Sequence, residues 1–167
     1  MIRLPILAAT ALAAATLAPA AHAVDLVQTV DIAAPPDKVW AIVADFDSIS
    51  KWHPAAKSSP ATKGNMKGSV RVITLNAPGD PTITEKLVAY DASAHFYRYD
   101  IVKVNPKVLP VIHYHSTFTV TPAGNGSQLV WSGTFDHAAG STDADAVKAI
   151  TGVYRGGLDN IKVLAEK

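Results

Sequence analysis

The sequence predicts an α+β fold, in which a mostly antiparallel sheet of seven strands carries two short helices and one long C-terminal helix. Three observations support this prediction. One strand pattern and two short helical patterns come first, six further strand patterns follow, and the hydrophobic period changes from two to about 3.6 residues after Gly140. No repeat, low-complexity tract or linker interrupts residues 24–167, so we expect a single domain there.

The first 23 residues have the pattern of a secretory signal peptide. Arg3 provides a positive charge, residues 4–17 form an apolar segment, and Ala21-His22-Ala23 offers a small-x-small cleavage site. The apolar segment is short and contains threonine, which favours cleavage over a membrane anchor. We therefore expect cleavage after Ala23 and, in a bacterium with an outer membrane, a periplasmic protein.

The composition argues against several function classes. Removal of the leader with Arg3 would leave as many basic residues as the 14 acidic ones, so the mature chain would carry no net charge. Neither nucleic acid nor an anionic membrane is therefore an expected partner. The chain has 0 cysteines, which excludes disulfides, thiol chemistry and thiolate metal sites. The later apolar runs are too short to span a bilayer, so we expect no membrane insertion after cleavage.

Turn and capping residues divide the chain into its elements. The first strand runs over Leu26–Ile32, a helix begins at Pro36, and a second short helix ends by Trp52-His53-Pro54. Six strands then span approximately Ala56–Thr62, Ser69–Leu75, Thr82–Tyr90, His95–Val104, Ile112–Thr121 and Ser127–Asp136. The last helix, from Asp143 to Ala165, directs one apolar stripe at the sheet, made of Val147, Ile150, Tyr154, Leu158 and Ile161.

Arg71 and Glu85 are the most informative pair of residues. A hairpin centred on Pro78 places them directly opposite each other on neighbouring strands, where opposite charges attract. Strand alternation puts both on the more apolar face, Arg71 with Ile73 and Glu85 with Ile83. A buried ion pair contributes little net stability, which favours a role in a site.

Two alternatives to a cavity pair stay open. The pair could be an ordinary salt bridge on the outer face, since Val70, Val72 and Val88 make the opposite face partly apolar as well, or a polar plug in a filled core. A turn that slips by one residue would also move both charges to the other face.

Aromatic residues of the later strands and the last helix complete the predicted cavity wall. Tyr99 is the preferred third site residue, because its hydroxyl could hydrogen-bond a ligand. The alternative is that these aromatic side chains are simply core. The ligand-binding residues expected from the sequence are Arg71, Glu85, Tyr97, Tyr99, Tyr114, Phe118, Trp131 and Tyr154.

The sequence offers no pattern for a metal or an organic cofactor. His113 and His115 share one face of a strand, but that face also carries threonines, so both histidines are expected in solvent and not at a metal. His53 is expected to pack or cap a loop near the cavity mouth. The helical glycines Gly152, Gly156 and Gly157 do not follow a strand and therefore form no nucleotide fingerprint.

Several local motifs occur together along residues 24–167, namely Ala34-Pro35-Pro36-Asp37-Lys38-Val39-Trp40, Trp52-His53-Pro54, Ile83-Thr84-Glu85-Lys86-Leu87, Leu109-Pro110-Val111 and Tyr154-Arg155-Gly156-Gly157-Leu158-Asp159-Asn160. With the order of elements, they resemble the SRPBCC superfamily of Bet v 1 allergens, START domains and polyketide cyclases. The motifs themselves are most similar to those of periplasmic MxaD-type proteins and plant lachrymatory factor synthases. This resemblance implies a helix-grip fold, in which a curved sheet and the long helix enclose a ligand-sized cavity.

Three functions are compatible with these observations. The first is an exported carrier that binds a small, partly apolar molecule. The second is a cofactor-free cyclase, lyase or isomerase in which Glu85 acts as the catalytic base and Arg71 stabilises an oxyanion, as the resemblance to the synthases implies. The third, implied by the MxaD resemblance, is an accessory protein of a periplasmic dehydrogenase. The pKa of Glu85 separates the first two, because a catalytic base needs a raised pKa.

The leader prediction has a direct test. We expect N-terminal sequencing of the protein from its own periplasm to begin at Val24, because Ala21-His22-Ala23 precedes the first strand. Recovery of the chain in a membrane fraction with Met1 retained would contradict both the cleavage and the location.

Overall fold

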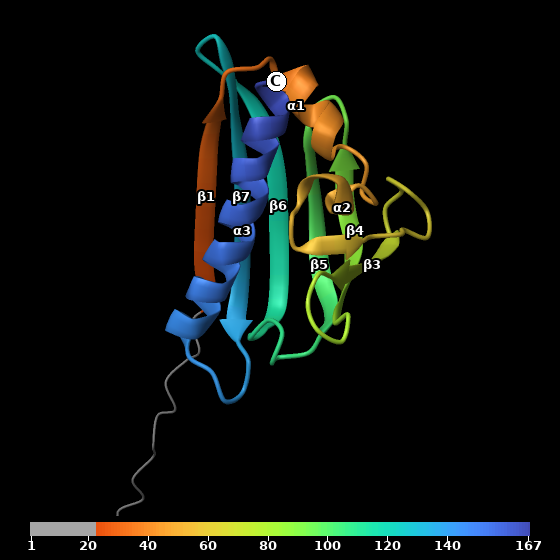
Figure 1. Ribbon diagram of the computed structural model, residues 1–167, viewed down its shortest axis with the longest axis vertical. Helices are drawn as coiled ribbons and strands as arrows, with labels where there is room; N and C mark the ends of the chain where they lie inside the picture. Colours follow the sequence, from red (N-terminus) through yellow and green to blue (C-terminus); the bar gives the residue numbers. More distant parts are fainter. Residues whose placement is uncertain (1–22) are drawn as a thin grey trace, which may run out of the picture.

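The computed structural model describes residues 23–167, so nearly all of the predicted signal peptide lies outside the described residues. Seven strands form one sheet in the order β1-β7-β6-β5-β4-β3-β2, and each neighbouring pair is antiparallel. Figure 1 shows α3 crossing one face of this sheet. The elements are β1 (Val24–Ile32), α1 (Pro36–Val43), α2 (Ile49–Trp52), β2 (Ala56–Ser58), β3 (Val70–Leu75), β4 (Thr82–Asp91), β5 (Phe96–Val104), β6 (Val111–Ala123), β7 (Gly126–His137) and α3 (Asp143–Ala165).

The predicted fold class is confirmed, since a seven-stranded antiparallel sheet, two short helices and a long C-terminal helix are all present. The core lies between the sheet and the helices. Alternate residues of β7 are buried, as period-two patterning requires when one face of a strand faces the core. None of the helices within residues 23–167 is long and apolar enough to cross a membrane.

The long helix has the boundaries that the sequence predicts. Its N-terminus carries a capping box, in which Thr142 accepts from the Asp145 N–H and Asp145 accepts from the Thr142 N–H. Ile150, Tyr154, Leu158 and Ile161 are buried as expected, whereas Val147 is only half-buried. The C-terminal end of α3 packs beside α1 near the top of the view in Figure 1.

The strand predicted over Ala56–Thr62 is shorter than expected. β2 ends at Ser58, and beyond it a single bridge joins Ala61 to Arg71. The reason is local, because Ser59 Oγ donates to the Asp47 carbonyl and accepts from Ser50 N–H, and Pro60 has no N–H to give to a sheet. The segment is therefore tied to α2 instead of extending the sheet.

We expect Leu158→Ala to lower the free energy of unfolding by about 2 to 5 kcal/mol, because Leu158 is fully buried where α3 packs on the sheet. Val163→Ala on the same helix is the matched control, since Val163 is 55% exposed and its truncation should change stability by less than about 0.5 kcal/mol. Urea denaturation measures both values. Equal losses for the two variants would mean that α3 packs with another face.

Two glycines of α3 should respond in opposite ways to alanine. A Cβ at Gly157 would lie 2.8 Å from Trp131 Cζ3 and 2.9 Å from His53 Cδ2, so Gly157→Ala should destabilise the fold by about 1 to 3 kcal/mol. A Cβ at Gly152 would meet nothing within 4 Å, so Gly152→Ala should stabilise the helix by about 0.5 to 1 kcal/mol. Denaturation midpoints measure both effects. A shift of the two midpoints in the same direction from the wild type would contradict this packing.

Candidate functional site

Arg71 and Glu85 form a buried ion pair between β3 and β4. Their strands pair in the register that places these two residues opposite each other, so the predicted hairpin register is confirmed. Arg71 Nε donates to Glu85 Oε2 at 2.6 Å, and the residues are only 1% and 5% exposed. The alternative of a solvated salt bridge on the outer face is therefore wrong.

Further contacts fix the guanidinium of Arg71. Nη1 donates to the Phe46 carbonyl at 2.7 Å, and the guanidinium carbon lies 4.2 Å from the centre of the Phe46 ring and 5.1 Å from that of Tyr99. Cation–π contacts of this kind strengthen when the groups are removed from water. Phe46 follows the end of α1, so the early helices hold Arg71 in place from the side opposite the sheet.

The ion pair leaves hydrogen-bonding capacity unused. Arg71 Nη2 is buried without a partner, and within residues 23–167 no hydrogen bond reaches Glu85 Oε1. Native proteins seldom leave buried polar atoms unpaired without a functional reason or a bound water. The carboxylate therefore presents one free acceptor oxygen.

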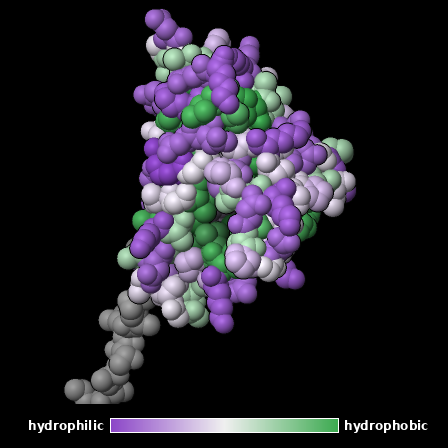
Figure 2. Space-filling model, in the orientation of Figure 1, coloured by the Kyte–Doolittle hydropathy of each residue, from purple (hydrophilic) through white to green (hydrophobic). Residues whose placement is uncertain are grey.

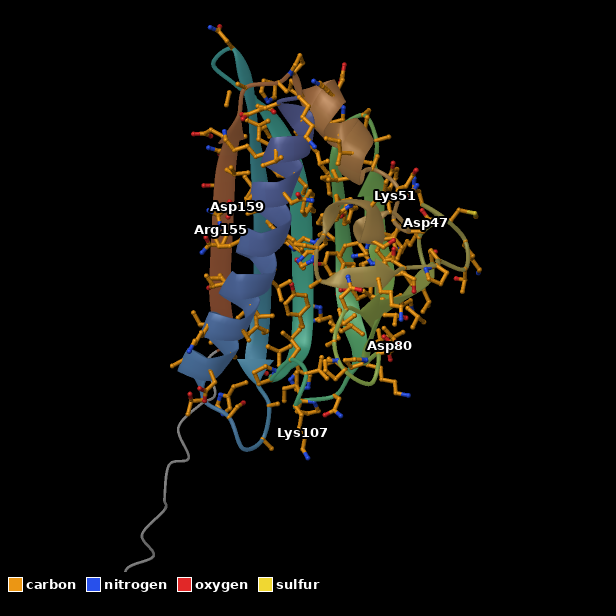
Figure 3. The ribbon with its side chains drawn as sticks, viewed as in Figure 1. Asp47, Lys51, Asp80, Lys107, Arg155 and Asp159 are labelled. Atoms are coloured by element: carbon orange, nitrogen blue, oxygen red, sulfur yellow. The ribbon has the colours of Figure 1, made fainter. Side chains whose placement is uncertain are left out.

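Glu85 lies on the wall of a cavity of about 100 Å³. The cavity reaches the surface between α3 and the α2–β2 segment, where Ala55, Leu75, Val108 and Val153 are partly exposed, and Figure 2 shows an apolar recess on this face. Charged side chains such as Lys51, Asp80 and Lys107 lie toward the edges of the same face (Figure 3). The cavity is lined by Ile49, His53, Ala55, Ala56, Ile73, Leu75, Ile83, Glu85, Tyr99, Ile101, Val108, Leu109, Tyr114, Trp131, Ile150 and Val153.

Half of the site residues expected from the sequence lie on this wall, namely Glu85, Tyr99, Tyr114 and Trp131. Arg71 lies behind Glu85 and is not part of the lining. The other three pack into the core: Tyr97 stacks on Phe118 at 5.4 Å between ring centres, and Tyr154 stacks on Trp131 at 4.5 Å. These rings fill space, and the cavity is correspondingly smaller than the ligand-sized one expected, since pockets for drug-sized ligands measure about 300 to 1,000 Å³.

A buried hydrogen-bond network adjoins the cavity. Trp131 Nε1 donates to Tyr99 Oη at 2.9 Å and to Ser116 Oγ at 3.0 Å. Ser116 Oγ donates to the Ser132 carbonyl and lies 3.3 Å from Tyr154 Oη, which is 2.6 Å from Tyr114 Oη. Ser116 was not expected at the site from the sequence, although its position between Tyr114 and Phe118 on the inward face of β6 was a usable signal.

His53 joins the cavity mouth to α3. Its Nδ1 accepts from the Ala55 N–H at 3.1 Å, which leaves the proton on Nε2 to donate to the Val153 carbonyl at 2.9 Å. Burial and, to a smaller extent, the charge of Arg71 lower the pKa of His53 against the effect of the Val153 bond. His53 is therefore a neutral loop-capping residue that also lines the cavity, as the sequence suggested.

Burial controls the protonation of the site. It raises the pKa of Glu85, and the neighbouring Arg71 opposes this shift without cancelling it. Burial would lower the pKa of Arg71, but the charge of Glu85 together with Tyr97 and Tyr99 raises it, so the guanidinium stays charged. Burial also raises the pKa of Tyr99 and Tyr114 well above ordinary values, and both remain neutral phenols.

The described residues offer no grouping of three or more histidine and carboxylate side chains that could hold a metal ion. His113 and His115 lie on the exposed side of β6, where the sequence places them, and each hydrogen-bonds one carboxylate, Asp136 at 2.8 Å and Asp100 at 2.7 Å. The two histidines thus make separate pairs on the outer face.

Comparisons with known proteins agree with this architecture. Residues 23–166 match the family described as polyketide cyclase / dehydrase and lipid transport. MLP-like protein 423 of Arabidopsis thaliana is 31% identical over 127 residues, which cover 68% of this chain and 77% of that protein.

Solved structures extend the likeness to the fold. The protein XoxI from Bacillus cereus superposes with a TM-score of 0.74 at 28% identity, over 84% of this chain and 94% of that one. The Zhui aromatase/cyclase from Streptomyces sp. R1128 has a TM-score of 0.69 over 87% of this chain and 94% of that one, and at 20% identity it shares the fold alone. Sequence match and fold together show that the chain belongs to the polyketide cyclase/dehydrase and lipid-transport family, within the Bet v 1-like SRPBCC superfamily.

Proposed function

We propose that this protein binds or carries a small, partly apolar molecule in the cavity beside Glu85. The observation that carries the proposal is a recess open to solvent, walled mostly by aliphatic and aromatic side chains, with Glu85, Tyr99, Tyr114 and His53 as the polar residues of its lining. Small-molecule sites typically combine such an apolar lining with a few polar groups that orient the ligand. The family description includes lipid transport, which agrees with a binding role.

Export belongs to the same proposal. A carrier with the leader predicted in residues 1–23 would bind its ligand in the periplasm. Docking on a periplasmic dehydrogenase stays a prediction from the resemblance.

A second candidate is a cofactor-free cyclase, lyase or isomerase, favoured by the raised pKa of Glu85. A carboxylate with a raised pKa in an apolar site is a stronger base and can accept a proton from a bound substrate. Arg71 does not line the cavity, so the hydroxyl of Tyr99 is the better placed donor to a developing oxyanion. Arg71 would then act by holding Glu85 in position.

The binding proposal predicts that a small molecule accompanies the protein. We expect gas chromatography with mass spectrometry to find it in extracts of the protein isolated from its own source, and not in extracts of Ala56→Leu. Ala56 is buried on the cavity wall, so the larger side chain would fill the space that the ligand needs. Identical extracts from the two proteins would contradict binding at this cavity.

Substitution of Glu85 separates carrier from enzyme. Glu85→Gln keeps the shape but removes the base, so a carrier should retain its ligand with altered affinity, whereas an enzyme should lose turnover by about 100-fold or more. Arg71→Met alone would leave a buried, unpaired carboxylate, so the double variant with Glu85→Gln is the stability control. A coupling energy of about 0.5 to 3 kcal/mol in this double-mutant cycle is expected for the observed pair.

The raised pKa of Glu85 also predicts a pH dependence of stability. Because the folded state holds this proton more tightly, the resulting stability is complete below the unfolded pKa of about 4.3 and is lost as pH rises through the raised folded pKa. The unfolding free energy of the wild type minus that of Glu85→Gln, measured by urea denaturation, should therefore fall as pH rises from about 4 to about 8. A difference that increases with pH would mean that Arg71 outweighs burial.

A further inference from the structure

We infer that the cavity selects a small neutral alcohol, whose oxygen accepts a hydrogen bond from Tyr99 and whose hydroxyl hydrogen is donated to Glu85. This inference rests on the proposed binding function and specifies its ligand. It follows from the size of the cavity, the unused hydrogen-bonding groups at its wall and the charge balance around it.

The volume limits the ligand to a few atoms. An apolar protein cavity of about 150 Å³ accommodates benzene, which has six carbon atoms. In proportion, the cavity here, at about 100 Å³, encloses about four non-hydrogen atoms, and because it opens to the surface a fifth can extend into its mouth. Ile73, Ile83 and Leu109 supply an aliphatic wall for its carbon chain.

The hydrogen bonds of the neighbouring hydroxyl groups show that the Tyr99 hydroxyl is free to donate its proton toward the cavity. Ser116 donates its only proton to the Ser132 carbonyl, so Tyr154 must donate to Ser116, and Tyr114 in turn donates to Tyr154. These hydroxyls are thereby satisfied. Tyr99 Oη accepts from Trp131 Nε1, and its other polar neighbour, Ser116 Oγ, already accepts from Trp131 and Tyr154, so the proton of Tyr99 is left for a ligand in the cavity.

Glu85 provides the complementary acceptor beside this donor. Glu85 pairs with Ile101 across β4 and β5, so Tyr99, two residues before Ile101, is its diagonal neighbour on the same face. Diagonal neighbours lie within reach of long and aromatic side chains, and both of these residues line the cavity, so one ligand hydroxyl can contact both. A ligand hydroxyl between them would accept from Tyr99 and donate to Glu85 Oε1, whereas a ketone could use only the first of these bonds.

Charge balance excludes ionic ligands. Arg71 lies 2.6 Å from Glu85 and neutralises it, and no other charged side chain lines the cavity in the described part of the chain. His53 is neutral because burial lowers its pKa and its Nδ1 accepts the Ala55 N–H. An ionic ligand would lose its hydration on entering the cavity, and no free opposite charge would offset this free-energy cost. A neutral molecule avoids this cost.

Five probes of five non-hydrogen atoms each test the inference: 2-butanol, butanone, 2-chlorobutane, sec-butylammonium and propanoate. Binding is followed through the methyl resonances of Ile73, Ile83 and Leu109 in the full mature protein. We expect 2-butanol to bind most tightly. Tyr99→Phe should weaken its binding about tenfold, the effect of one net hydrogen bond, and leave 2-chlorobutane unchanged.

Tyr90→Phe is the control, because Tyr90 is a half-buried tyrosine on the neighbouring strand β4 whose hydroxyl accepts from Asn65 and which does not line the cavity. It should leave the affinity for 2-butanol within about twofold, well inside the effect of one hydrogen bond. Tighter binding of butanone, 2-chlorobutane or either ion would overturn the alcohol inference while leaving the binding function intact. Absence of saturable shifts with all five probes would overturn both.

Discussion

The burial of one ion pair shapes the rest of this structure. Arg71 and Glu85 face each other across β3 and β4 with almost no exposure to solvent. Removing two charges from water costs several kcal/mol per ion, which attraction repays only with good geometry and additional partners. The Phe46 carbonyl and two aromatic rings provide those partners for Arg71, and they couple the early helices to the sheet.

Glu85 receives less compensation than Arg71, and this asymmetry defines the site. Its carboxylate has one hydrogen bond from the described residues and a free oxygen at the cavity, so burial raises its pKa despite the neighbouring cation. A neighbouring cation ordinarily lowers the pKa of a carboxylate, so a tight ion pair and a raised carboxylate pKa seldom occur together. They occur together here because desolvation acts on the whole group, whereas Arg71 binds only Oε2.

The sequence was sufficient for the order and approximate extent of most elements because local patterns determine them. Hairpin symmetry about Pro78 predicted the Arg71–Glu85 register, and the change of period after Gly140 predicted α3. It was insufficient for the cavity, because strand alternation tells which face a ring occupies but not how far neighbouring rings interlock. Tyr97 shares the inward face of β5 with Tyr99, and Tyr154 lies on the buried face of α3, yet stacking on Phe118 and Trp131 removes both from the wall.

The central claim is that Glu85 and Tyr99 present an unused acceptor and an unused donor to one small cavity. High-resolution crystallographic density in that cavity tests it most directly. We expect density for a ligand or an ordered water within hydrogen-bond distance of both Glu85 Oε1 and Tyr99 Oη. A direct hydrogen bond from Tyr99 to Glu85, with no space between the two side chains, would contradict it.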